Sequence, residues 1–210
     1  MQSQSPLLPA SADALLFDLG RVVLDIDFGK VVSTWAGHAG CEPAHLVERF
    51  SPNDAWHRHE RGEISDAEFF AGLRKSLGIE ISDTQFLEGW NAIFAGEMPD
   101  IAASLARAGQ SLPLYAFSNT NNAHVEHFSH AYADVLGHFR EIYLSSTIGL
   151  RKPDAAAYDH VVQAIGVPAS RIVFFDDSAA NIEGARARGL TAVHVTGPDD
   201  VAKTLAALGI

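Results

Sequence analysis

The sequence predicts an α/β fold: a parallel sheet flanked by helices, with a helical segment inserted after the first strand. Short apolar runs occur at the start of the chain and throughout its second half, where a helical pattern follows each run. Strands that alternate with helices pair in parallel through right-handed crossovers. From about residue 28 to residue 99 the apolar residues recur at helical spacing instead. We therefore expect a core of residues 13–27 and 100–210, an all-helical insertion at residues 28–99, and a flexible polar tail at residues 1–12.

The composition is that of a globular protein and argues against several classes of function. The chain has 210 residues, of which 47% are hydrophobic, so it can bury a sizeable core. Its formal net charge is −11 and its basic residues form no long run, which argues against nucleic-acid binding. A single cysteine, Cys41, suits a reducing compartment, and we find no signal peptide or membrane-spanning apolar run. We expect a cytoplasmic protein, monomeric or homodimeric, with neither a nucleic acid nor a membrane as partner.

The first apolar run, residues 14–19, contains one charged residue, Asp18. A continuous apolar run of this length is typical of a strand that is buried on both faces. A carboxylate at the end of such a strand is unfavourable unless a metal or a lysine pairs with it, or a reaction uses it. Gly20 ends the run, and residues 22–26 should leave the strand as a loop or hairpin. Asp18 therefore predicts a partner elsewhere in the chain.

The insertion has the periodicity and the start signals of helices. Ser65 and Glu68 have the spacing of a capping box and open an amphipathic pattern. Ser82 and Gln85 repeat this spacing, and the helical pattern after them continues to Phe94. Three tryptophans are expected in the apolar core of the insertion: Trp35, Trp56 and Trp90.

The second half of the chain alternates strands and helices. The predicted strands cover residues 112–117, 141–144, 171–175 and 190–195, and the predicted helices cover about 99–108, 154–165, 178–188 and 201–208. In parallel sheets of this kind, ligands bind beyond the carboxyl ends of the strands. Six polar residues follow these strands, or stand on a loop beyond one, and should gather at this edge: Asp18, Ser118, Asn119, Lys152, Asp176 and Asp177.

The acidic members of this group can hold a hard cation. Asp18 and Asp177 supply the carboxylates that Mg²⁺ prefers, and the backbone carbonyl of Gly20 can serve as a further ligand. Asp176 is expected to support this metal shell. A row of histidines has no cysteine or carboxylate cluster beside it, so we interpret it as part of an ordinary helix rather than a zinc site. The row consists of His124, His127 and His130.

The other members suit a phosphoryl group. The Ser118 hydroxyl and the amides near Asn119 can donate hydrogen bonds to phosphoryl oxygens, while Lys152 supplies a positive charge for the phosphate or for a carboxylate nucleophile. Together with a metal, they would neutralise the charge that develops during phosphoryl transfer. Asp18 can then attack phosphorus and form an aspartyl-phosphate that water hydrolyses.

The order and spacing of these residues resemble the haloacid dehalogenase (HAD) superfamily, whose members are mostly phosphatases. The matching segments are Phe17-Asp18-Leu19-Gly20, Phe117-Ser118-Asn119-Thr120, Lys152-Pro153-Asp154, and Phe174-Phe175-Asp176-Asp177-Ser178 with Asn181. The resemblance implies a Rossmann-like (HAD-like) core, a helical C1-type cap at residues 28–99, Mg²⁺ as cofactor and a small phosphorylated substrate. Further segments resemble the bacterial α-D-glucose-1-phosphate phosphatases of this superfamily: Asp25-Ile26-Asp27-Phe28, His59-Glu60-Arg61-Gly62-Glu63-Ile64-Ser65, Ser118-Asn119-Thr120-Asn121 and Arg151-Lys152-Pro153.

One position departs from the family pattern. Most phosphatases of the superfamily carry a second aspartate two residues after the nucleophile, as general acid and base, where this chain has Gly20. General acid–base help is worth ~10²–10⁴ in rate. Another side chain could replace it, or the leaving group could be an anomeric sugar hydroxyl, which departs more readily than an ordinary alcohol. Two cap histidines, His57 and His59, are also expected to contact the substrate. The candidate replacements are Asp25, Asp27, His57, His59 and Glu60.

The sequence therefore predicts a Mg²⁺-dependent phosphatase for a small phosphomonoester such as a sugar 1-phosphate, with Asp18 as nucleophile. Two alternatives stay open. A dehalogenase would use Asp18 to displace halide from carbon without a metal, a reaction for which the paired acids at positions 176 and 177 are less suitable. A catalytically silent binding protein would have kept the pocket and lost the acid at position 20.

Overall fold

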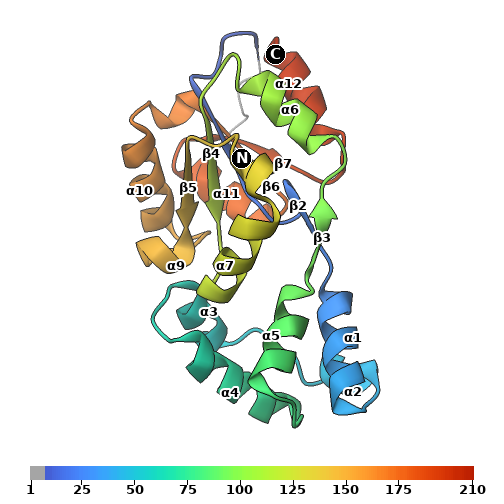
Figure 1. The fold of residues 1–210 in the computed structure, drawn as a ribbon. Coiled ribbons are helices and arrows are strands. Elements are labelled where there is room, and N and C mark those ends of the chain that lie inside the picture. The colour runs from blue at the N-terminus through green and yellow to red at the C-terminus, as the bar shows by residue number, and fades with distance from the viewer. Residues whose placement is uncertain (1–7) are drawn as a thin grey trace.

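The computed structural model describes residues 8–210, and the part of the predicted tail at residues 1–7 lies outside the described residues. The strands of the core are β1 (Ala14–Phe17), β4 (Leu114–Ser118), β5 (Glu141–Leu144), β6 (Ile172–Asp176) and β7 (Thr191–His194). They form a five-stranded sheet in the order β5-β4-β1-β6-β7, with parallel pairing between all neighbours (Figure 1). The predicted α/β fold with a parallel sheet is confirmed.

Helices cover both faces of this sheet. They are α6 (Ile101–Ala108), α7 (Asn122–Ala131), α8 (Ala133–Leu136), α9 (Ser145–Ile148), α10 (Ala155–Ile165), α11 (Ala179–Ala187) and α12 (Asp200–Ala207), with a 3-10 turn at Ala169–Arg171. Alternate residues of β1 point to opposite faces. Leu15 and Phe17 pack in one apolar cluster with α6, α7, α8 and α12, whereas Ala14 and Leu16 pack in a second cluster with α10 and α11. No helix within residues 8–210 is long and apolar enough to cross a membrane.

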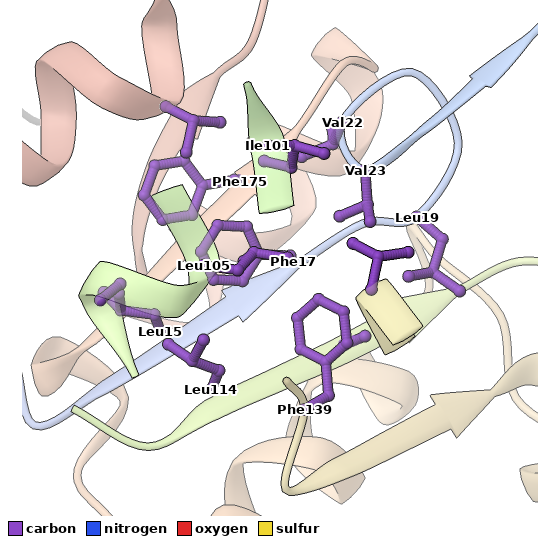
Figure 2. Packing of buried hydrophobic residues seen from close by; sticks show 14 of the residues in the cluster. Leu15, Phe17, Leu19, Val22, Val23, Ile101, Leu105, Leu114, Phe139 and Phe175 are labelled. Atoms are coloured by element: carbon purple, nitrogen blue, oxygen red, sulfur yellow. The ribbon is translucent and has the colours of Figure 1, made fainter. Parts of the chain in front are cut away.

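The sheet is closely packed directly beneath Asp18. The ring of Phe17 stacks on that of Phe175 from β6, with centroids 4.6 Å apart, and Phe139 lies 5.9 Å away (Figure 2). Both Phe17 and Phe175 are fully buried, and each such side chain contributes roughly 1.5–3 kcal/mol to folding. The carboxylate that follows β1 therefore stands on a rigid apolar base.

The insertion forms the cap, a group of five helices at one end of the core (Figure 1). They are α1 (Phe28–Ala39), α2 (Pro43–Val47), α3 (Asp54–Glu60), α4 (Asp66–Leu77) and α5 (Asp83–Asn91). The two predicted start signals are in place. Ser65 Oγ accepts from the Glu68 N–H at 3.2 Å, and Ser82 with Gln85 forms the full reciprocal capping box.

The prediction of an all-helical insertion at residues 28–99 was wrong at its end. Helix α5 ends at Asn91, and Phe94–Glu97 forms β3, which pairs antiparallel with β2 (Leu24–Ile26). The reason is that the Phe94 ring packs on α7 of the core, 5.5 Å from His127 and 5.9 Å from Phe128. Phe94 follows the helical spacing of the apolar residues before it, but it packs on the core, whereas those residues pack in the cap. Strands β2 and β3 connect the cap to the core.

An aromatic cluster forms the core of the cap and contains the three tryptophans, as predicted. Trp35 and Trp90 are buried with ring centroids 6.0 Å apart, and Trp56 packs edge-on against Trp90 at 5.4 Å. Trp35 Nε1 donates a 2.9 Å hydrogen bond to the Phe86 carbonyl of α5. Gly89 permits this approach, because a Cβ at that position would overlap the Trp35 ring. The fit between α1 and α5 thus depends on one glycine.

A second set of contacts, centred on His124, joins the cap to α7. His124 Nε2 donates to the Trp90 carbonyl at 3.1 Å, and Nδ1 accepts from the Asn121 amide at 3.1 Å. The Asn121 Oδ1 accepts from the Trp90 indole at 3.2 Å and from the His124 N–H at 3.1 Å. Burial lowers the pKa of His124 to about 4, which agrees with the neutral ring that this hydrogen-bond pattern requires. Both ring nitrogens are therefore committed to the contact between cap and core.

We expect Gly89→Ala to lower the free energy of unfolding by about 1–3 kcal/mol, because the added methyl group overpacks against Trp35. Urea unfolding measures the change. Gly72→Ala in α4 is the matched control, since nothing lies within 4 Å of its added Cβ. Loss of a helix-interior glycine at that open position should stabilise the protein by about 0.5–1 kcal/mol. Equal effects of the two substitutions would contradict the packing argument.

We expect the protein to lose stability as the pH falls from about 6.5 to about 4, through His124. The fold holds its pKa below the ordinary value of 6.5, so the unfolded chain takes up the proton first, and the loss amounts to at most about 3 kcal/mol. His124→Gln keeps a donor and an acceptor but does not titrate. The wild type's stability advantage over this variant, from urea unfolding at several pH values, should therefore shrink across this range. An advantage that stays constant would contradict the assignment.

Candidate active site

A cavity of about 220 Å³ lies beyond the carboxyl edge of the sheet, between core and cap. Parallel strands end together at this edge, so residues far apart in the sequence meet there. Six of the predicted site residues line the cavity: Asp18, Gly20, Ser118, Asn119, Lys152 and Asp177. Asp176, His57 and His59 are not among its lining residues.

Asp18 directly follows β1, and only 12% of its side chain is exposed. Its Oδ1 accepts from the Leu19 N–H at 2.8 Å and lies 2.8 Å from Lys152 Nζ in an ion pair. Its Oδ2 makes no hydrogen bond within the described part of the chain. Burial raises the pKa of Asp18 to about 7, Lys152 opposes this rise, and Asp176 adds to it. One oxygen is thus fixed in place while the other remains available to a ligand.

Lys152 is the buried cation of the site, with 1% of its side chain exposed. Its Nζ lies 2.8 Å from Asp18 Oδ1 and 2.7 Å from Asp176 Oδ2, and it donates to the Phe117 carbonyl at 2.8 Å. Burial lowers the pKa of Lys152, but the two carboxylates raise it by more, so the net direction is upward. The ammonium group therefore has three protein oxygens within 2.8 Å. Lys152 can therefore act on a substrate through its charge and through the position of Asp18.

Asp176 holds this lysine rather than facing the cavity. It is fully buried, and its carboxylate accepts from Lys152, from the Ser178 N–H at 2.8 Å and from Asn181 Nδ2 at 3.0 and 3.1 Å. Asn181, part of the fourth matching segment, thus completes the environment of Asp176. Both carboxylate oxygens have partners, which suits the supporting role that the sequence suggested for Asp176.

Asp177 reaches the cavity, with 27% of its side chain exposed and Arg21 Nη1 3.8 Å away. Burial and the neighbouring Asp176 raise the pKa of Asp177. Oxygen atoms of Asp18, Asp176 and Asp177 lie within 4.8 Å of one another. This all-oxygen set fits a hard divalent cation, whose charge would offset that of the crowded carboxylates. Among residues 8–210 the histidine row forms no comparable group.

Asn119 fixes the loop that carries Lys152. Its Nδ2 donates to the Lys152 carbonyl at 2.8 Å, and its Oδ1 accepts from the Lys152 N–H at 2.9 Å. The side chain of Asn119 is therefore used for positioning, although the residue lines the cavity as predicted. Ser118, the last residue of β4, is buried and also lines the cavity.

The space beside Gly20 is occupied by an apolar side chain. A Cβ built on Gly20 would lie 3.0 Å from Ile26 Cδ1, and Ile26 itself lines the cavity. The two nearby aspartates proposed as replacement acids lie elsewhere. Asp25 and Asp27 are exposed and do not line this cavity, and Asp27 caps α1 through the Gly29 N–H at 2.8 Å. Neither is placed to protonate a leaving group.

The cap histidines are also outside the cavity. His59 is buried in the cap, where Nε2 lies 2.6 Å from Asp66 Oδ1 and its ring stacks on Phe69 with centroids 4.1 Å apart. His57, half-buried on the same short helix, does not line the cavity either. The structure therefore gives no support to substrate contacts by His57 and His59.

Two other residues of α3, Trp56 and Glu60, line the cavity instead. The sequence interpretation assigned Trp56 to the cap core and considered Glu60 as a replacement acid. A signal was available, because residues four apart share one face of a helix. Arg151, next to Lys152, was not among the predicted site residues. Its Nε lies 2.8 Å from Glu60 Oε2.

Comparisons with known proteins identify relatives of this chain. Residues 12–189 match the family model for haloacid dehalogenase-like hydrolases. Sesquiterpene phosphatase astK of Aspergillus oryzae is 30% identical over 179 residues, which cover 81% of this chain and 87% of that protein. Phosphatase MT3486 of Mycobacterium tuberculosis is 33% identical over 215 residues, covering 95% and 96%. The chain spans only 35% of the length of a further relative, drimenol cyclase drtB of Aspergillus calidoustus.

The fold is similar to that of a solved structure. A HAD family enzyme of Bacteroides thetaiotaomicron, in a crystal structure with magnesium and inorganic phosphate, superimposes with a TM-score of 0.75. It is 24% identical, and the match covers 87% of this chain and 93% of that one. With the family model matched over most of its length and two phosphatases among its relatives, the chain belongs to the haloacid dehalogenase-like hydrolases.

Proposed function

We propose that the chain is a Mg²⁺-dependent phosphatase that hydrolyses a small phosphomonoester through an aspartyl-phosphate on Asp18. The observation that carries this proposal is the state of the Asp18 carboxylate. One oxygen is fixed by Leu19 and Lys152, while the other has no partner in the described chain and belongs to a residue that lines a cavity of about 220 Å³. A pre-positioned carboxylate of this kind is suited to nucleophilic attack.

In the proposed reaction, an electron pair of Asp18 Oδ2 forms a bond to phosphorus as the bond to the leaving oxygen breaks. The leaving group carries away the electron pair of the broken P–O bond and takes a proton from water, because the position of the usual acid is Gly20, next to Ile26. Water then attacks phosphorus and breaks the bond to Oδ2, which releases inorganic phosphate and restores the carboxylate. The proton that this water loses neutralises the hydroxide formed in the first step. Throughout, the Lys152 ammonium holds Asp18 in place and offsets negative charge near the phosphoryl group.

Asp18, Asp177 and the Gly20 carbonyl would hold the Mg²⁺, and Asp176 would support them by fixing Lys152. When bound, the cation supplies charge neutralisation at the phosphoryl oxygens. The oxygen-only donor set supports this assignment, as does the magnesium bound to the Bacteroides enzyme of the same fold.

The substrate is proposed to be a sugar 1-phosphate, as the sequence suggested. Without a general acid the leaving group must depart without prior protonation, and an anomeric hydroxyl does so more readily than an ordinary alcohol. Ile26 strengthens this reasoning, since it fills the space beside position 20 with an apolar group. Faster turnover of simple alkyl phosphates than of sugar 1-phosphates would contradict it.

We expect Asp18→Asn to reduce phosphatase turnover by more than about 10³-fold, because the amide cannot serve as the nucleophile. The assay is phosphate release from a panel of sugar phosphates, nucleotides and a chromogenic aryl ester with Mg²⁺. The variant should remain folded, because Lys152 keeps its ion pair with Asp176 and the amide avoids the cost of burying a charged group. Substantial residual turnover would remove Asp18 from the nucleophile role. A wild type that is inactive on the whole panel would favour the silent binding protein.

We expect removal of divalent cations with EDTA to reduce turnover by at least about 100-fold, with recovery on addition of Mg²⁺. Binding can be measured independently of activity, because a ligand that binds the folded state raises the thermal midpoint. Mg²⁺ should raise the midpoint of the wild type and raise that of Asp177→Asn much less. Full activity in EDTA, or release of halide from a 2-haloacid without metal, would favour the dehalogenase alternative.

A further inference from the structure

Helix α3 brings two chemically different side chains to the cavity. Trp56 and Glu60 are four residues apart and therefore lie on the same face of the helix, and both line the cavity. Glu60 is the one charged residue that the cap contributes to the lining described within residues 8–210. An aromatic ring and a carboxylate thus face the same space from the cap side.

Two polar residues at the start of α7, Asn121 and His124, also line the cavity, and their side chains have partners already. Asn121 Oδ1 accepts from Trp90 and from the His124 N–H, and both ring nitrogens of His124 are hydrogen-bonded. Glu60 differs, because Oε2 pairs with Arg151 while Oε1 makes no hydrogen bond in the described chain. Glu60 is therefore the cap group with an acceptor to offer a ligand.

The orientation of Glu60 is tied to the phosphate site. Its partner Arg151 precedes Lys152. The backbone N–H and carbonyl of Lys152 are both hydrogen-bonded to the Asn119 side chain. Only 12% of the Glu60 side chain and 18% of the Arg151 side chain are exposed, so the pair is largely shielded from water. Close to it, Gly62 lies against the Ser146 carbonyl, where a Cβ would overlap the oxygen. The end of α3 is thus fixed on the core.

Trp56 is equally well fixed. Its ring meets Phe50 edge-on at 5.5 Å and 87°, and Trp90 at 5.4 Å and 67°. An aromatic face suits the C–H face of a saturated ring, and a carboxylate with a free oxygen suits the hydroxyl groups at the edge of such a ring. Ligand sites commonly combine an apolar wall with a few placed polar groups.

We infer that Trp56 and Glu60 form the leaving-group subsite and select a polyhydroxylated ring, a pyranose, attached to the phosphate. This inference rests on the proposed phosphatase function and adds the residues that recognise the organic part of the substrate. Glu60 accepts a hydrogen bond from a ring hydroxyl, Trp56 packs on the C–H face, and Arg151 is the positioning residue for Glu60.

The experiment compares two substrates, glucose 1-phosphate and p-nitrophenyl phosphate, which share the phosphoryl group but not the hydroxyls. We expect Glu60→Ala to lower kcat/KM for glucose 1-phosphate by roughly 10- to 150-fold, the effect of losing a hydrogen bond to a charged group. The same variant should change kcat/KM for p-nitrophenyl phosphate by less than about 3-fold. Trp56→Leu, which keeps an apolar side chain, should lower the sugar value by about 10-fold and spare the aryl ester.

Glu63→Ala is the matched control, since Glu63 is a nearby cap carboxylate that pairs with Arg61 and Arg58 and does not line the cavity. It should leave both substrates unchanged. If Glu60→Ala does not fold, Glu60→Gln keeps the size and an acceptor for Arg151, and should lower the sugar value alone. Glucose 1-phosphate binding to Asp18→Asn should also weaken when Glu60→Gln is added.

Several results would overturn the inference. An equal loss on both substrates would mean that Glu60 only positions the Lys152 loop through Arg151. No loss on either, or a wild type that hydrolyses the aryl ester through Asp18 but no sugar phosphate, would also refute the subsite while leaving the phosphatase proposal intact. A wild type inactive on every ester would instead refute the proposed function itself.

Discussion

The structure of the site depends on the ammonium group of Lys152. It joins Asp18 after β1, the Phe117 carbonyl of β4 and Asp176 at the end of β6, each within 2.8 Å. These are the three central strands of the sheet. Removing one partner of a buried ion pair typically destabilises a protein by about 3–5 kcal/mol, because the other charge is left without compensation. The lysine therefore fixes the ends of the three strands relative to one another, and with them the direction of the Asp18 carboxylate.

The surroundings of that lysine explain why its interactions are strong. The strand ends below it are packed with aromatic side chains, among them Phe17 and Phe175 stacked at 4.6 Å, and water has no access from the sheet. Charges in such a setting interact more strongly than at a surface. The same setting penalises each carboxylate, which is why burial raises the pKa of both Asp18 and Asp177. The packed aromatic core therefore keeps the strand ends rigid, and the same burial makes the charged form of each carboxyl group at this edge unfavourable.

The sequence predicted the core well because its signals are local. Apolar runs marked the strands, and the residue after each run marked the edge where ligands bind, so Asp18, Ser118 and Asp177 could be brought together without coordinates. The sequence could not predict which of these polar side chains already have hydrogen-bond or ion-pair partners within the protein. The Asn119 amide binds the Lys152 backbone, and His59 is paired with Asp66 inside the cap. Both partnerships depend on contacts between segments that no spacing rule relates.

Phe94 illustrates the same limit for the fold. Its spacing from Trp90 is helical, yet its ring packs on α7 and its backbone pairs with Ile26. Only the tertiary contacts decide that the helix stops at Asn91.

Gly20 can be understood through the balance of charge at this edge. Asp18, Asp176 and Asp177 face one buried lysine, with Arg21 3.8 Å from Asp177, so the cluster is already short of positive charge before any phosphate enters. A fourth carboxylate at position 20 would add repulsion, and its Cβ would press on the end of the Ile26 side chain. With Gly20 the backbone carbonyl is retained, the cluster carries one less charge, and Ile26 closes the space. Proton transfer to the leaving group is then left to solvent. Discrimination between substrates depends on the groups on the opposite side of the cavity. Among them, Glu60 is fixed relative to the loop of Lys152, and so to Asp18, by its ion pair with Arg151.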